Sequence, residues 1–215
     1  MFDQLFRKHL QNVFLLLGEE PPSALLEPIG ADRRQSRPFT QPSGLLTVKI
    51  DGRETYFEWL NAGVYTPSAA RGTMTMTKAQ RIEALYFGFD AARLLLRFDA
   101  ALGVRKQLAD IDTLRIVFSE PKGFEVLVTQ PGAPQPMVQL FHNDVPVSAA
   151  GVDAAAGKIL EIAIPWRSLA AATDAPVQFH AELIQRDQSV ERIPHEGTIE
   201  TFVPSPDYEL MMWQA

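Results

Sequence analysis

The chain has 215 residues, 46% of them hydrophobic, and a formal net charge of -6, which is typical of a folded domain with a substantial core. The acidic balance, without any cluster of Lys and Arg, argues against binding to a nucleic-acid backbone. The absence of cysteine excludes disulfides and thiolate metal sites and fits a reducing compartment. No apolar run reaches the roughly 18 residues that a membrane-spanning helix needs. The amino terminus lacks a signal-peptide pattern, so we expect a cytoplasmic protein without membrane contact.

The amino-terminal part of the chain predicts a helix followed by a linker. Apolar residues recur at steps of three and four over residues 2–17, which indicates one amphipathic helix. A glycine and two prolines come soon after and favour its end. Residues 19–43 are rich in Pro, Arg, Ser and Gln and are typical of a linker. We therefore divide the chain into a helix with its linker, 1–43, and a domain, 44–215, and expect the helix to dock on that domain or on a partner.

The segment GLLTVKIDGRETYFEWLNAGVY, residues 44–65, predicts the first hairpin of this domain. Apolar and polar residues alternate over 46–50 until the Asp51-Gly52 pair, which is a strong turn signal. An aromatic strand is expected over 54–60, with a bulge or bend at the Asn-Ala-Gly that follows.

The rest of the chain repeats short apolar runs separated by Gly, Pro and Asp. No predicted helix between the strands is long enough for a parallel crossover, so an antiparallel arrangement is expected. The fold class is therefore mostly β, an antiparallel β-sandwich of about ten strands with an N-terminal α-helix. The strands are expected at 46–50, 54–60, 81–89, 93–98, 114–118, 124–128, 137–142, 159–164, 177–185 and within 190–203.

Two carboxylate pairs were weighed as catalytic groups. Glu54 with Glu58, or Glu182 with Glu191, could catalyse glycoside hydrolysis if held about 5 to 10 Å apart. Pairs on strands, however, are usually parts of a solvated face. We therefore predict no catalytic residue in this chain.

No metal site or cofactor is predicted. The histidines His9, His142, His180 and His195 lie far apart in the sequence and lack the spacing of metal ligands. Calcium bound by a loop carboxylate is the open alternative, because sandwich modules often use oxygen ligands. The candidate ligands would be Asp90, Asp99 and Asp153.

Residues 56–65 gather aromatic and hydrogen-bonding side chains near an expected bend. Sugars stack their CH faces on Trp and Tyr, while carboxylates and amides bind their hydroxyl groups. The alternative is that these aromatics pack in the core, which is also the prediction for Trp166. The candidate carbohydrate-binding residues are Tyr56, Glu58, Trp59, Asn61 and Tyr65.

Four stretches carry a resemblance to a known family. MFDQLFRKHLQNVFLLLGEEPP, IDGRETYFEWLNAGVY, ALYFGFDAARLLLRFD and LEIAIPWRSL resemble the carboxy-terminal region of glycoside hydrolase family 57 proteins, the amylase-like intracellular enzymes. In that family a catalytic β/α barrel comes first, then a helical region, and some members end in a β-sandwich similar to DOMON-type modules. GFDAARLLLRFD and LEIAIPWRSL are also similar to family 9 carbohydrate-binding modules.

The resemblance implies an accessory role. The family's catalytic nucleophile and acid lie in barrel motifs that have no counterpart here, so no catalytic residue is carried over. The implied function is a non-catalytic accessory domain that binds an α-glucan or oligosaccharide beside the upstream catalytic and helical domains of its enzyme. The alternatives are a structural domain packed on the catalytic part, or one that completes the active-site cleft. Exposed aromatics would favour sugar binding, and buried aromatics the structural role.

Overall fold

The computed structural model describes residues 40–55, 57–67 and 80–208, together with residues 9, 13, 14 and 16. The fold set out below lies in Pro38–Ala215, one of the chain's two units. The helix expected at 2–17 and the linker at 19–43 fall almost wholly outside the described residues, as does Tyr56. No helix within the described ranges is long and apolar enough to cross a membrane.

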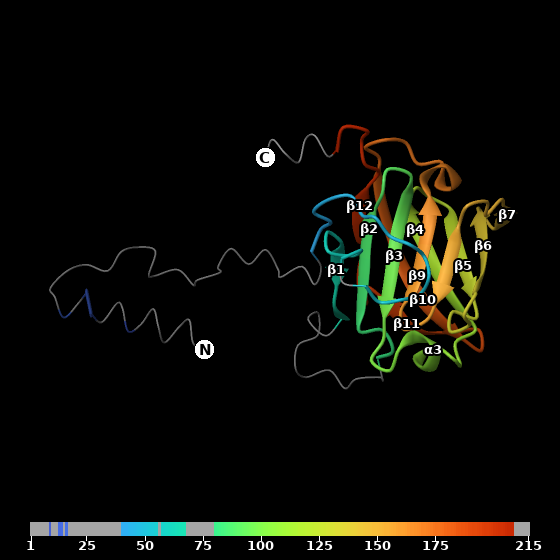
Figure 1. Ribbon diagram of the computed structural model, residues 1–215, viewed down its shortest axis with the longest axis horizontal. Coiled ribbons are helices and arrows are strands. Elements are labelled where there is room, and N and C mark those ends of the chain that lie inside the picture. Colours follow the sequence, from blue (N-terminus) through green and yellow to red (C-terminus); the bar gives the residue numbers. More distant parts are fainter. Residues whose placement is uncertain are drawn as a thin grey trace. The chain divides into compact units, whose positions relative to one another are not determined.

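Within the described residues, the strands form a five-stranded sheet and a seven-stranded sheet, and all pairings are antiparallel (Figure 1). The five-stranded sheet has the order β1-β2-β3-β9-β8, made of β1 (Gly63–Tyr65), β2 (Ala84–Phe89), β3 (Arg93–Asp99), β9 (Leu160–Pro165) and β8 (Asp153–Ala156). The seven-stranded sheet has the order β11-β10-β4-β5-β6-β7, with β12 also paired to β10. Its strands are β11 (Gln188–Ile193), β10 (Pro176–Gln185), β4 (Thr113–Glu120), β5 (Phe124–Thr129), β6 (Met137–His142), β7 (Val145–Val147) and β12 (Ile199–Phe202).

Alternating side chains place the core between the two sheets. In β4, for example, Leu114, Ile116 and Phe118 are buried while the residues between them are not, as the two-residue period of a strand requires. Inward residues of both sheets join one hydrophobic cluster. The expectation of a mostly β, antiparallel fold is confirmed, and the sheets pack in a sandwich-like manner.

The connections between the strands complete the fold, and the expected burial of Trp166 is confirmed. The turn after Phe89 joins β2 to β3, and the proline-rich segment 131–136 joins β5 to β6. The connection at 102–111 contains the short helix α3 (Val104–Gln107). Trp166, at the start of the 3-10 helix η2 (Trp166–Leu169), is 5% exposed and belongs to the core as expected.

The first hairpin was predicted wrongly. The described residues of the two expected strands, 46–50, 54–55 and 57–60, are not in strands. Residues 57–61 are a turn, and of the described residues 40–67 only those of β1 join the sheet, beside β2. The Asp51-Gly52 turn does form, and Gly52 has φ 73°. Instead of pairing with a neighbour in the sequence, the segment formed by residues 44–62, which we call the covering segment, packs on the five-stranded sheet.

Candidate functional site

The covering segment buries the outer face of the five-stranded sheet. Leu46, Val48 and Trp59 form a second hydrophobic cluster with Leu95 of β3 and Ala163 of β9. Because side chains alternate along a strand, these two strand residues point away from the main core and would otherwise meet water. The apolar positions that suggested a strand therefore serve to cover a sheet.

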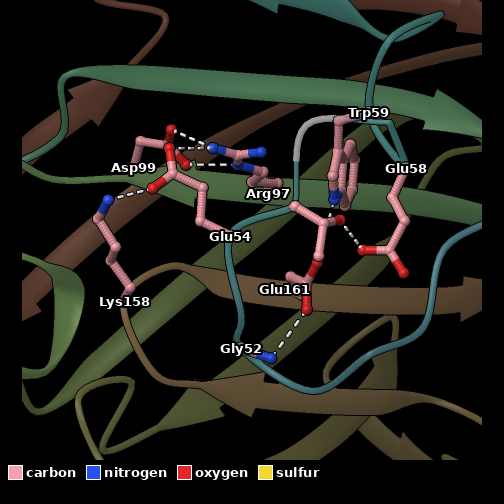
Figure 2. A network of polar contacts seen from close by, with 9 residues as sticks. Gly52, Glu54, Glu58, Trp59, Arg97, Asp99, Lys158 and Glu161 are labelled. Carbon is pink, nitrogen blue, oxygen red and sulfur yellow. Dashed lines mark hydrogen bonds and ion pairs between the residues drawn. The ribbon is translucent and has the colours of Figure 1, made fainter.

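A buried carboxylate fixes the covering segment in place (Figure 2). Glu161 of β9 is fully buried and accepts hydrogen bonds from the Asp51 amide at 3.0 Å, the Gly52 amide at 2.8 Å and Trp59 Nε1 at 3.0 Å. Burial raises the pKa of Glu161, while the three N–H donors act in the opposite direction. A Cβ atom at Gly52 would lie 2.5 Å from the Gly157 amide nitrogen, so the turn requires glycine there.

A buried arginine lies on the same face of the sheet (Figure 2). Arg97 is 5% exposed, donates to both carboxylate oxygens of Asp99 at 2.7 Å and stacks over the Tyr86 ring at 4.7 Å. Its guanidinium also reaches Glu54 of the covering segment at 3.4 Å. The hydrogen bond from Lys158 lowers the pKa of Glu54 below its ordinary value. These groups form a paired network in which each buried charge has a partner.

The two aromatic candidates that the structure describes, Trp59 and Tyr65, do not offer exposed faces. Trp59 is 4% exposed and Tyr65 1% exposed. The Trp59 indole is held by Glu161, and Tyr65 belongs to the main core with its hydroxyl accepting the His195 amide at 3.3 Å. Neither ring can therefore act as a stacking platform in this conformation, because its faces contact protein rather than solvent.

The polar candidates remain near the surface but do not converge with those rings. Glu58 is half-buried and accepts hydrogen bonds from the Thr55 hydroxyl and, at 3.4 Å, from the Lys49 amide. Asn61 is exposed, and its backbone carbonyl accepts the Ser43 amide at 2.9 Å. Both groups help to shape the turn of the covering segment.

An exposed aromatic lies next to these candidates. Phe57 is 82% exposed and Leu60 is 60% exposed. A strand would have placed Phe57 and Trp59 on one face, whereas the observed turn at 57–61 separates them. The strand interpretation of this stretch therefore missed Phe57, although three aromatic residues within positions 56–59, next to an expected bend, were the available signal.

The carboxylate pairs considered for catalysis are engaged in other contacts. Glu54 pairs with Lys158 and Arg97. Glu182 pairs with Arg115 at 3.2 Å and lies 3.6 Å from His180. Such contacts are those of structural ion pairs, and they give these pairs no evident catalytic arrangement.

Glu191 and two of the three calcium candidates, Asp90 and Asp99, show the same pattern, while Asp153 is exposed at the start of β8. Glu191 accepts the Arg81 amide at 2.8 Å, Asp90 pairs with Arg93 at 2.7 Å, and Asp99 is held by Arg97. Among the described residues, no group of three or more His, Asp or Glu could hold a metal ion.

Comparison with known protein families, with curated proteins and with solved structures gives no match for this chain. The site must therefore be interpreted from its own geometry. In that geometry the covering segment packs on the five-stranded sheet through one apolar cluster and contacts two buried side chains, Glu161 and Arg97.

Proposed function

We propose that this chain is a non-catalytic accessory domain of a glycoside hydrolase family 57-like protein, with a structural or interaction role against the catalytic part of its enzyme. The family assignment rests on the four sequence stretches that resemble that family. The role rests on one observation, the burial of Trp59 and Tyr65. Aromatic side chains that stabilise the domain from within favour the structural alternative over sugar stacking.

The contacts of the carboxylates support the non-catalytic part of the proposal. A glycosidase needs one carboxyl group free to donate a proton and a second free to act as base or nucleophile. In the candidate pairs, Glu54, Glu182 and Glu191 are engaged by cationic side chains or backbone amides. We expect the isolated chain to hydrolyse neither glucans nor model glycosides. Turnover above buffer that disappears on mutation of a carboxylate of this chain would overturn this part.

Glucan binding is the second candidate, and the exposure of Phe57 favours it. A ring that is 82% exposed, with exposed Asn61 in the same turn, supplies one platform and one amide for a sugar. A single platform supports weak binding, with a dissociation constant of about 0.1 to 1 mM or above.

Affinity electrophoresis through gels that contain amylose, glycogen or pullulan separates the two candidates. The structural role predicts the same mobility with and without glucan. The glucan-binding role predicts that glucan retards the wild type and that Phe57→Ala abolishes this retardation. The control Leu102→Ala, at another exposed apolar position, should leave the retardation intact. This result would replace the structural role with the glucan-binding role. Leu102 is 70% exposed, so both substitutions remove similar surface without disturbing the core.

A further inference from the structure

A cleft of about 440 Å³ lies at the end of the five-stranded sheet where β3 begins and β9 ends. Its apolar walls come from Ala91 and Ala92 in the turn between β2 and β3, and from Pro165 and Trp166 where β9 passes into η2. The volume falls within the range of about 300 to 1,000 Å³ that is usual for small-molecule sites. The four carbohydrate-binding candidates that the structure describes do not line this cleft.

The charged side chains of the cleft are both cationic. Arg93 and Arg167 line it, and no carboxylate is among its lining residues in the described part of the chain. Asp90 Oδ2 accepts a hydrogen bond from Arg93 Nε at 2.8 Å and forms an ion pair with Arg93 Nη2 at 2.7 Å. This contact fixes the Arg93 guanidinium and offsets one of the two charges, which leaves a local positive charge in a chain whose net charge is -6.

The Arg167 guanidinium lies close to a glycine. Gly151 has φ 84°, and a Cβ atom there would lie 3.2 Å from Arg167 Nη2 and 3.2 Å from Pro165 Cγ. The guanidinium therefore lies against the backbone at Gly151, beside the proline wall of the cleft. Arg167 is exposed, and within the described ranges no carboxylate forms an ion pair with it.

Trp166 lines the cleft and carries an indole N–H donor. Its ring is 5% exposed, and Nε1 is buried without a hydrogen-bond partner among the described residues. A buried donor without a partner is uncommon in a folded domain and is often explained by a group that the structure does not contain.

We propose that this cleft binds a small organic oxyanion, a carboxylate or phosphate monoester carried on an apolar body. A guanidinium group binds either head group through two parallel N–H donors, and the Pro165, Trp166 and alanine surfaces suit the apolar body. The site is distinct from the covering segment, and the proposal does not rest on the glucan or structural role.

Titration of the ¹⁵N-labelled full chain with phenyl phosphate, benzoate, benzyl alcohol and maltotriose tests the proposal. The sequence has three tryptophans, so the indole N–H signal of Trp166 can be assigned by Trp166→Phe and followed directly. We expect at least one of the two anions to shift it, with a dissociation constant of about 0.1 to 1 mM, while the Trp59 indole signal stays in place. The anion that binds with the lower dissociation constant shows whether the cleft prefers a phosphate or a carboxylate head group.

The variants separate the role of Arg167 from general charge effects. Arg167→Gln should weaken anion binding about tenfold or more, and Ala91→Glu, which places a carboxylate at the mouth, should do the same. Arg105→Gln, an exposed arginine in α3 at the other end of β3, should leave binding unchanged. No shift with either anion, equal binding of benzyl alcohol or maltotriose, or unchanged binding in Arg167→Gln would each overturn the proposal.

Discussion

The outer faces of the two sheets differ in how they meet their surroundings. On the five-stranded sheet, Glu161 is buried under the covering segment and accepts three hydrogen bonds from it, and the buried Arg97 pairs with Asp99. On the seven-stranded sheet, Arg115 and Glu182 pair side by side on neighbouring strands, and Arg115 remains 41% exposed. We therefore expect arginine and glutamate side chains to contribute much to the unfolding free energy on the covered face and little on the open face. The reason is that water screens the pair formed by Arg115 and Glu182.

Truncation of the buried Glu161 side chain should cause the largest loss of unfolding free energy among the charged residues compared. Glu161→Ala leaves three N–H donors without an acceptor, and the expected loss of unfolding free energy is about 3 to 5 kcal/mol. Urea denaturation followed by circular dichroism measures this loss. Glu125→Ala, the same change at a half-buried position on β5, is the matched control and should cost about 1 kcal/mol or less. Equal losses in both variants would contradict the account.

Removal of the buried arginine should have an intermediate effect. Arg97→Leu deprives Asp99 of two charge-assisted hydrogen bonds, and we expect a loss of about 2 to 3 kcal/mol, since Asp99 keeps some access to water. Arg97→Lys retains the charge without the two-pronged geometry and should fall between wild type and Arg97→Leu. A loss for Arg97→Lys as small as the error of the denaturation measurement would argue against the importance of that geometry.

The titration of Glu161 should make the covered face sensitive to pH. Its folded-state pKa is raised above the ordinary value of 4.5, so its contribution is fully present below that value and is lost as pH rises through the folded-state pKa. Glu161→Gln removes this titration. The difference in unfolding free energy between wild type and Glu161→Gln should therefore shrink as pH rises from about 4.5 through the folded-state pKa. A difference that grows with pH would mean that the N–H donors outweigh burial.

The smallest effect is expected on the open face. Arg115→Leu removes a half-exposed partner of Glu182, and we expect a change of less than about 1 kcal/mol that diminishes further in high salt. Denaturation at low and high sodium chloride measures it. If Arg115→Leu proved as damaging as Arg97→Leu, the distinction between the two faces would be lost.

The parts of the fold that the sequence predicted well are those with local partners. The strands β2 and β3 are adjacent in the sequence, and Asp90 bonds the amides of Ala92 and Arg93 to close the turn between them. Period-two alternation and a turn signal are enough to predict such a hairpin.

The covering segment could not be predicted in this way. Its alternation of apolar residues is the same whether it pairs with a strand or lies across a sheet, and its acceptor Glu161 is 110 residues away from Asp51. The available signal was an acidic residue inside the apolar run LEIAIP, because a carboxylate in a buried strand needs donors from elsewhere. The cleft beside Arg167 brings together three separate segments, so no single stretch of sequence indicated it.

Trp59→Ala tests the central claim, that Trp59 is a structural residue rather than a sugar platform, most directly. The account predicts a loss of about 3 to 5 kcal/mol of unfolding free energy in urea denaturation, as for other buried large aromatics, with unchanged mobility in glucan-containing gels. A loss below about 1 kcal/mol, together with glucan retardation in wild type that the variant lacks, would contradict it.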